Sequence, residues 1–171
     1  LCSLHFHYGW DPENVVANAL FADGAAALVG ARGPSGGRWE VAASGSCLLP
    51  DCEDAMTWTL GDHGFLMTLS SRVPALIGEH LRPWRSRWRA PHALELDAIA
   101  SWAVHPGGPR ILSAVEEALS LPAGSTAVST EVLAQHGNMS SPTVLFILER
   151  LRARAAPRPC VALAFGPGLA V

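Results

Sequence analysis

The stretch TEVLAQHGNMSSPTVLFILERLR, residues 130–152, contains two predicted helices and an asparagine at the corner between them. Gly137 ends the first helix, and Ser141 followed by Pro142 is typical of the N-cap and first position of the second. The corner residue, Asn138, has two interpretations. Either it tolerates a left-handed turn beside Gly137, or its side-chain amide donates a hydrogen bond where negative charge develops on a carbonyl oxygen. The local sequence by itself favours the turn.

Outside this stretch, predicted strands and helices alternate along the chain, which indicates an α/β domain with a mostly buried sheet. Further helices are expected at residues 12–20, 73–88 and from 109 onward. Strands are expected at residues 1–8, 25–31, 39–50, the end of 96–106 and 160–171, with a strand or hairpin at 56–70. No tandem repeat and no long linker divides the chain, so residues 1–171 are expected to form a single domain.

The composition is that of a folded protein, because 49% of the 171 residues are apolar and 16% are charged. The net charge is −3 and every basic residue is an arginine, a weak footprint for nucleic-acid binding. The segment PWRSRWR, residues 83–89, is better interpreted as a solvated helix end than as a nucleic-acid surface. No apolar run is long enough to span a bilayer and no signal peptide is apparent, so a cytoplasmic protein without a membrane partner is expected. The absent initiator methionine indicates that the sequence starts within a longer protein.

Metal and disulfide chemistry find little support in the pattern of cysteines and histidines. The four cysteines are Cys2, Cys47, Cys52 and Cys160. They lack CxxC spacing, which argues against a disulfide framework or a structural zinc site. His5 and His7 share one face of a predicted strand, but two such side chains without a third ligand are usually a polar edge. No metal site is therefore expected.

His105, in the segment SWAVHPGGPR, is the strongest candidate for chemistry that the local sequence offers. It ends an apolar strand and precedes a glycine turn into a helix. In open α/β sheets, ligands collect at the carboxyl ends of strands. A histidine that is simply satisfied within a strand-to-helix turn is an equally good interpretation.

Four segments, taken in order, carry a family resemblance. They are ALFADGAAALVGA (19–31), VHPGGPRIL (104–112), residues 130–152 and FGPGLAV (165–171). Together they resemble the C-terminal half of type III polyketide synthases, the chalcone and stilbene synthase family, which has a thiolase fold. The opening LCSLHF is most similar to bacterial members such as the tetrahydroxynaphthalene synthases. The resemblance extends over the whole chain and implies a mixed buried sheet with helices packed on it.

The resemblance implies decarboxylative condensation of malonyl-CoA onto an acyl-CoA starter, followed by cyclisation. His105 matches the family histidine and Asn138 the family asparagine of a three-residue catalytic set. An imidazolium beside a thiol favours the reactive thiolate, and both side chains can hold the malonyl thioester carbonyl. No cofactor is implied, since acyl-CoA and malonyl-CoA are substrates. Homodimers are usual in the family.

The resemblance also indicates a substrate pocket. Gly166, Pro167 and Gly168 match the loop that helps to shape the family's cyclisation pocket. Met67 falls where the family has a gatekeeping aromatic residue, with Phe65 two residues earlier. A smaller or more flexible gate would change which starter groups enter.

The third member of the catalytic set, a nucleophilic cysteine, lies in the family's N-terminal half, upstream of this chain. Cys2 matches a non-catalytic strand position. The chain is therefore expected to be a fragment that needs an N-terminal half as its partner and is inactive alone. Two alternatives remain: a non-catalytic half-domain that serves only in dimerisation or assembly, and another thiolase-fold condensing enzyme similar to ketoacyl synthase III.

Overall fold

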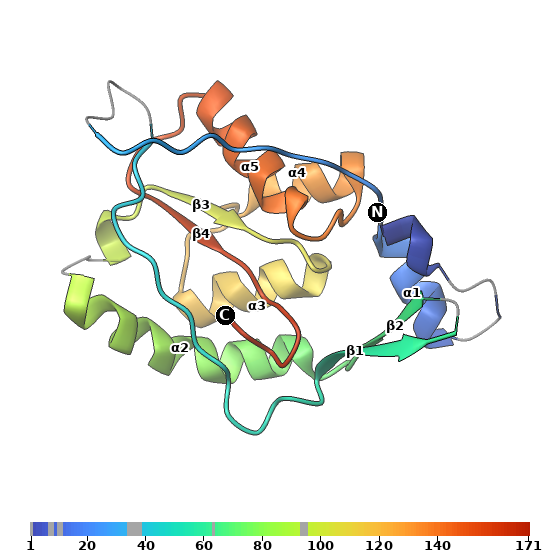
Figure 1. The fold of residues 1–171 in the computed structure, drawn as a ribbon. Helices are drawn as coiled ribbons and strands as arrows, with labels where there is room; N and C mark the ends of the chain where they lie inside the picture. The colour runs from blue at the N-terminus through green and yellow to red at the C-terminus, as the bar shows by residue number, and fades with distance from the viewer. Residues whose placement is uncertain (1, 7–8, 10–11, 34–38, 63, 93–95) are drawn as a thin grey trace.

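The computed structural model describes residues 2–6, 9, 12–33, 39–62, 64–92 and 96–171 (Figure 1). Its α-helices are α1 (Pro12–Leu20), α2 (Val73–His92), α3 (Pro109–Leu119), α4 (Ala127–His136) and α5 (Pro142–Ala153). Its strands are β1 (Met56–Gly61), β2 (Gly64–Leu69), β3 (Ser101–Val104) and β4 (Cys160–Leu163). Two short 3-10 helices are η1 (Cys2–His5) and η2 (Leu96–Ala98). The predicted α/β class is confirmed.

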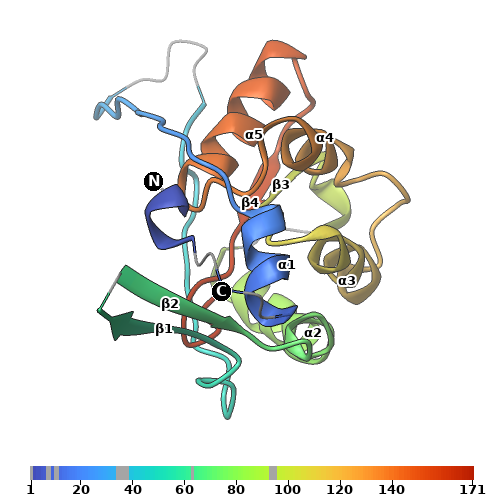
Figure 2. The ribbon, with the colours of Figure 1, turned by 90° about the vertical axis from the view of Figure 1, so that its right-hand side faces the viewer.

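The parallel pair β3–β4 forms the centre of the molecule, with Ser101 opposite Cys160 and Val104 opposite Leu163. Helices α4 and α5 lie on one side of this pair, and α3 and α2 on the other (Figures 1 and 2). Successive side chains of a strand point to opposite faces. Trp102 and Val104 accordingly join the apolar cluster that includes α2 and α3, whereas Ala103 joins the one under α4 and α5.

Helix α3 begins as its sequence predicts, with Pro109 in the first turn, and its buried side chains are Ile111, Leu112, Val115, Ala118 and Leu119. Ile77 and Leu81 of α2 are fully buried in the same cluster. The Arg82 side chain of α2 donates hydrogen bonds to the Glu117 and Ala118 carbonyls. These carbonyls belong to the last turn of α3, where carbonyl groups have no N–H four residues on within the helix; that of Glu117 also accepts the Ser120 N–H at 3.2 Å.

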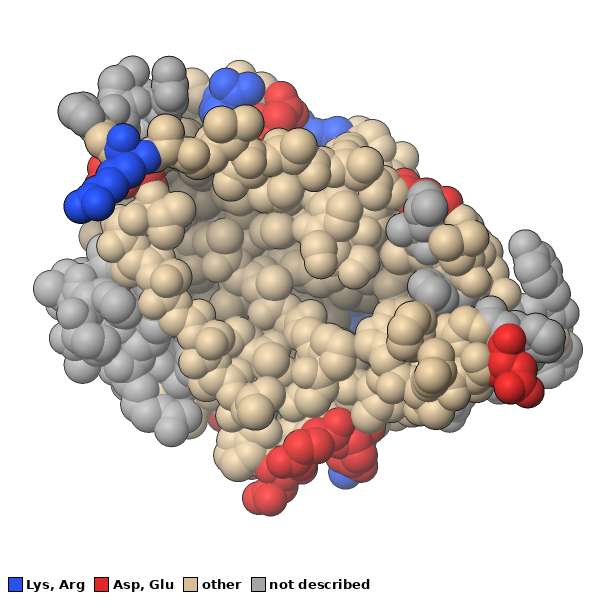
Figure 3. Space-filling view, in the orientation of Figure 1, with Lys and Arg blue, Asp and Glu red and all other residues tan. Residues whose placement is uncertain are grey.

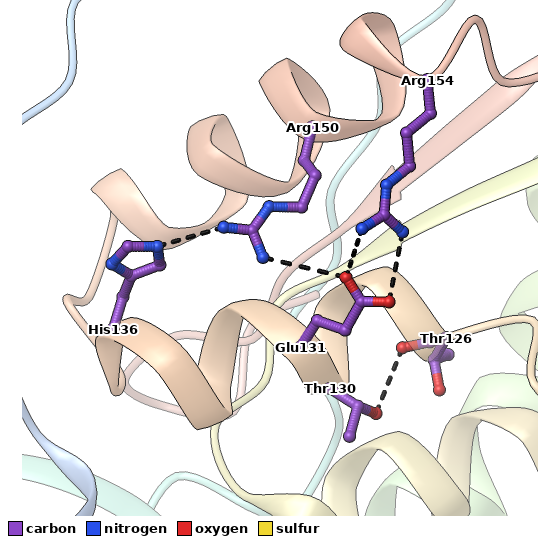
Figure 4. Close-up of polar contacts among 6 residues, drawn as sticks. All are labelled: Thr126, Thr130, Glu131, His136, Arg150 and Arg154. Atoms are coloured by element: carbon purple, nitrogen blue, oxygen red, sulfur yellow. Dashed lines mark hydrogen bonds and ion pairs between the residues drawn. The ribbon is translucent and has the colours of Figure 1, made fainter.

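Polar contacts on the surface add to the apolar packing between α4 and α5 (Figure 4). Both carboxylate oxygens of Glu131 accept hydrogen bonds from the Arg154 guanidinium, at 3.1 and 2.5 Å. Arg150 reaches the same carboxylate at 3.8 Å and the His136 Nε2 atom at 3.1 Å. The predicted position of arginines in the last turns of α5 therefore places them against α4.

The predicted hairpin at 56–70 is confirmed as the antiparallel pair β1–β2, with Trp58 opposite Met67. It lies beside α1 and η1, at the edge of the molecule away from β3–β4 (Figure 1). This hairpin and β3–β4 are separate two-stranded sheets, so the described residues do not form one continuous mixed sheet.

Three strand predictions are wrong for this chain. Residues 2–5 form a 3-10 helix, where the Asp23 carboxylate accepts hydrogen bonds from both the backbone N–H and the hydroxyl of Ser3. Residues 25–31 are extended without strand pairing, and residues 39–50 pair only at an isolated bridge at Leu48. A strand needs a neighbour for its peptide groups, and no described part of this chain offers one to residues 24–33.

Candidate active site

His105 directly follows β3, and the backbone around it is fixed on both sides. Its N–H donates to the Leu163 carbonyl of β4 at 2.8 Å, while the preceding N–H, that of Val104, donates to the Ser129 hydroxyl at 3.2 Å. Successive N–H groups of a strand point to opposite edges, so the two bonds hold β3 from β4 and from α4. Because Pro106 is also fully buried, the histidine occupies a rigid strand end.

Burial sets the protonation state of His105. It lowers the pKa of the imidazole from its ordinary 6.5 to about 4. The side chain is therefore neutral at pH 7, with one ring N–H that donates and one ring nitrogen that accepts. In this chain the group is a neutral hydrogen-bond donor rather than a cation.

Asn138 lies at the corner between α4 and α5, where the chain pairs with the segment that follows α1. Its N–H donates to the Leu20 carbonyl at 2.7 Å, and its carbonyl accepts from the Ala22 N–H at 2.9 Å. The preceding Gly137 has φ +71°, and a Cβ there would lie 2.7 Å from the Ala22 Cβ. Glycine is thus required both for its conformation and for the close approach of the two segments.

The interpretation of Asn138 as the left-handed residue of this corner is not supported. The positive φ angles belong to Gly137 and Ser140, at 71° and 62°. Ser141 stands at the predicted N-cap but makes no side-chain capping bond; instead the Thr143 hydroxyl accepts the Met139 N–H at 2.8 Å. Asn138 nevertheless contributes to the turn through its side chain, whose oxygen accepts the N–H of the residue two positions on.

In the side chain of Asn138, the amide oxygen has a hydrogen-bond partner and the amide nitrogen has none among the described residues. Its Oδ1 accepts a hydrogen bond from the Ser140 N–H at 2.9 Å. An N–H requires an acceptor, so the amide oxygen must face Ser140 and the Nδ2 group must face away. No described residue accepts a hydrogen bond from Nδ2, although the residue is only 4% exposed. A buried donor without a partner is costly in a folded protein and calls for an explanation.

Leu20 connects the two candidate residues. Its carbonyl accepts the Asn138 N–H, and its Cδ1 atom lies 3.6 Å from where a Cβ on Gly108 would stand. Gly108 closes the loop that His105 opens. The loop after β3 and the corner after α4 therefore both contact Leu20, at the end of α1.

Met67 and Phe65 line a single pocket together with Trp58 and Phe21. Phe21 is the bridge partner of Asn138, although neither Asn138 nor His105 lines this pocket. Trp58 and Phe65 make an edge-to-face contact with ring centroids 6.1 Å apart. Sequence reasoning missed Trp58 and Phe21; the register of the 56–70 hairpin, which pairs Trp58 with Met67, was the available signal for the first.

The Gly-Pro-Gly loop does not line that pocket. Gly166 and Ala170 exchange backbone hydrogen bonds, and Gly168, with φ +74°, donates its N–H to the Met56 carbonyl at 2.8 Å. The loop therefore lies against the start of β1. It is connected to the pocket through the hairpin, rather than by its own side chains.

Cys2, Cys52 and Cys160 have the properties of structural residues, because burial raises the pKa of each thiol. Burial raises the pKa of the Cys52 thiol, which lies 3.8 Å from the His80 ring, and also that of Cys2 in the pocket wall. Thiols of raised pKa are poor nucleophiles. His7, the His5 side chain and the side chains of residues 84–89 lie outside the described residues. In the described chain, no group of three or more potential metal ligands occurs, and no helix is long and apolar enough to cross a membrane.

Apolar side chains are exposed along the two extended segments. The exposed fraction is 78% for Leu28, 95% for Val29, 83% for Val41 and 70% for Leu48. Figure 3 shows one face of the molecule that is hollowed and mostly uncharged in its middle, with acidic and basic side chains gathered at the rim. Large exposed apolar areas mark contact surfaces in folded proteins.

Solved structures define the class of this fold. The chain superposes on a tetrahydroxynaphthalene synthase from Streptomyces coelicolor A3(2), a bacterial type III polyketide synthase, with a TM-score of 0.84 and 27% identity. It superposes on PKS-I from the brown alga Ectocarpus siliculosus with a TM-score of 0.83 and 28% identity. The alignments cover 99% of this chain and 49% and 48% of those chains. The fold is thiolase-like.

The chain belongs to the chalcone and stilbene synthase family, whose C-terminal domain it matches over residues 40–171. It is 42% identical over 175 residues to the 1,3,6,8-tetrahydroxynaphthalene synthase of Streptomyces peucetius subsp. caesius, covering 98% of this chain and 46% of that protein. It is 35% identical over 180 residues to the alpha-pyrone synthesis polyketide synthase-like Pks18 of Mycobacterium tuberculosis, covering 100% and 46%. The chain thus spans about half the length of the relatives it matches, as the resemblance to a C-terminal half predicts.

Proposed function

We propose that this chain is the catalytic C-terminal half of a type III polyketide synthase. The assembled enzyme condenses malonyl-CoA with loss of CO2 onto an acyl-CoA starter and cyclises the product. Membership of the family supports this assignment, as do the activities for which the relatives are named, tetrahydroxynaphthalene and alpha-pyrone synthesis. CoA thioesters are the substrates, and the proposal includes no cofactor.

The observation that carries the proposal is the free amide donor of Asn138. When a malonyl thioester loses CO2, the C–C bond breaks and its electron pair moves to form an enolate, so the thioester oxygen becomes negative. A donor held in place beforehand stabilises that charge without reorganising. Asn138 has such a donor, since the Ser140 N–H already occupies its oxygen. Removing one donor of this kind typically raises a barrier by about 2.7–4 kcal/mol.

His105 supplies the second donor in this proposal. Its partly buried, neutral imidazole offers one ring N–H to the same oxygen. The nucleophilic cysteine comes from the N-terminal half, and its thiolate, once beside the ring, favours the imidazolium form. The histidine therefore acts first as the partner of the thiolate and then as a donor to the enolate.

Substrate selection is assigned to two regions, the apolar pocket and the Gly-Pro-Gly loop. The pocket of Met67, Phe65 and Trp58 is lined mainly by apolar side chains, which suits the acyl part of a starter rather than the CoA phosphates. The loop of Gly166, Pro167 and Gly168 is assigned to the wall of the cyclisation pocket.

The N-terminal half is proposed to cover the extended segments at 24–33 and 39–46. Their peptide groups lack strand partners among the described residues, and Leu28 and Val29 expose apolar side chains. An added strand would satisfy both deficits at once. The assembled protein is proposed to be a homodimer in the cytoplasm, where free cysteines such as these persist.

Reconstitution tests the proposal. The chain alone should give no polyketide from malonyl-CoA, whereas co-expression with the N-terminal half of the Streptomyces peucetius relative should give product. His105→Ala in the co-expressed chain should abolish it. Product from the isolated chain would disprove the need for a partner cysteine. A fully active His105→Ala variant would disprove the role of the histidine.

One observation favours a second function, a non-catalytic half-domain that acts only in assembly. The exposed apolar segments would serve as a contact surface whether or not chemistry follows. This alternative predicts stable homodimers of the chain and no heat of binding with malonyl-CoA, even when an N-terminal half is present. The catalytic proposal predicts binding in the assembled protein.

A further inference from the structure

Two fully buried hydroxyl groups, one on α4 and one on α5, contact the backbone beside the candidate catalytic residues. Ser129 and Thr143 are each 0% exposed. The Ser129 Oγ accepts the N–H of Val104, the residue before His105, and the Thr143 Oγ1 accepts the N–H of Met139, the residue after Asn138. The two helices thus each hold one candidate residue through its neighbour.

The Ser129 hydroxyl supplies a hydrogen-bond acceptor on the edge of β3 that does not pair with β4. β4 pairs with the inner edge and receives the His105 N–H, so the Val104 N–H points away from β4. That N–H is fully buried and would otherwise have no acceptor. The Ser129 hydroxyl therefore fixes how far the strand end, and with it the imidazole, stands from α4.

The Thr143 contact fixes the turn that orients the Asn138 amide. Thr143 accepts the Met139 N–H through its side chain at 2.8 Å and donates its own N–H to the Ser140 carbonyl at 3.0 Å. Ser140, held in this way in a left-handed conformation, donates its N–H to the Asn138 Oδ1. The direction of the free Nδ2 group thus depends on a chain of hydrogen bonds that ends at one hydroxyl.

We infer that Ser129 and Thr143 are positioning residues, which aim the His105 imidazole and the Asn138 amide at a common oxygen without touching the substrate. The inference rests on the proposed function, and it deepens that function by naming the residues that fix the relative positions of the two donors. A displacement of a catalytic group by about 1 Å can cost about a hundredfold in rate.

Two substitutions at Thr143 distinguish a role in positioning Asn138 from a role in packing alone. Thr143→Val keeps the volume and removes the acceptor, whereas Thr143→Ser keeps the hydroxyl and leaves a small cavity. If Thr143 serves only packing, the valine variant should have the higher rate of malonyl-CoA decarboxylation. If its hydroxyl orients Asn138, the serine variant should have the higher rate.

In the enzyme assembled with the N-terminal half, Thr143→Val and Ser129→Ala should each lower kcat for malonyl-CoA decarboxylation by about tenfold to a hundredfold. KM should change by less than about threefold, because the donors act mainly in the transition state. Thr143→Ser should stay close to the unaltered enzyme. Thr130→Val is the matched control, since Thr130 is exposed on α4 and its hydroxyl donates to the carbonyl of the N-cap residue Thr126 (Figure 4).

Equal kcat values for the valine and serine variants, or a faster valine variant, would overturn the inference. An unaltered assembly without decarboxylation would count against the proposed function instead. In that case amide hydrogen exchange on the 171-residue chain decides the inference. Thr143→Val should speed amide exchange at Met139 and shift the Asn138 side-chain amide resonances, whereas Thr143→Ser should leave both unchanged. Unchanged resonances in the valine variant would overturn the inference.

Discussion

The region from 101 to 171 and the segments from 22 to 50 differ in how many of their contacts they make within the chain. In the first region, β3 is buried at all four positions and every helix packs on an apolar cluster. In the second, Val29 is 95% exposed and the peptide groups of residues 24–33 have no strand partner in the described chain. The first region therefore finds its packing partners within the chain, α2 included, whereas residues 24–33 and 39–46 have the form of one side of an interface.

The largest difference between the two regions is expected in the loss of stability when one apolar side chain is shortened in each. Ile147→Ala on α5 removes a fully buried side chain and should lower the free energy of unfolding by about 2–5 kcal/mol. Val29→Ala should change it by less than about 0.5 kcal/mol. Urea unfolding monitored by circular dichroism measures both, and equal effects would mean that the two regions do not differ in packing.

Replacing a glycine by alanine should likewise destabilise the chain more in the first region than in the second. Gly137→Ala places a Cβ 2.7 Å from the Ala22 Cβ at φ +71° and should destabilise the chain by about 2–4 kcal/mol. Gly30→Ala meets nothing within 4 Å and should be neutral within about 0.5 kcal/mol. Thermal melts of the two variants make the comparison, and a Gly137→Ala variant as stable as the unaltered chain would contradict the close packing of the corner.

Acid should destabilise the first region through His105. Its folded pKa of about 4 lies below the ordinary 6.5, so between these values the unfolded chain binds more protons. Stability is therefore full above about pH 6.5 and falls as the pH falls toward 4, by about 1–2 kcal/mol at pH 5. His105→Gln should remove this part of the pH dependence, as measured by unfolding at pH 7 and pH 5. Parallel curves for the two proteins would show that the imidazole is not buried.

The smallest effect is expected where the first region meets solvent. Arg154→Ala removes the bidentate contact to Glu131, whose side chain is 38% exposed, and should lower the free energy of unfolding only slightly. The loss should shrink further in 0.5 M salt, because exposed charges are screened. A larger and salt-insensitive loss in urea unfolding would place this contact among the interactions that hold α4 to α5.

The sequence predicted best those elements that find their partners within the chain. Helices α3, α4 and α5 follow from apolar spacing and from glycine and proline at their ends, and β3 follows from its continuous apolar run. The strands predicted at 25–31 and 39–50 failed for a physical reason. Their pattern suits a buried sheet, but strand pairing depends on a neighbour that the described residues do not contain.

The candidate site was predictable in its residues but not in its chemistry. The motifs identified His105 and Asn138, and the roles of these two residues stay predictions. The neutral state of His105 depends on burial, and the free Nδ2 of Asn138 depends on the Ser140 N–H, neither of which a linear sequence displays. Trp58 and Phe21 join the pocket only because the hairpin and the segment after α1 come together in the fold.

The most direct test of the catalytic assignment is the rate of malonyl-CoA decarboxylation by the assembled enzyme with and without Asn138→Ala. The unaltered assembly should release CO2 and form acetyl-CoA, and the variant should do so about 10²–10³-fold more slowly at an unchanged KM. The same rate in both proteins would contradict the role given to the Asn138 amide.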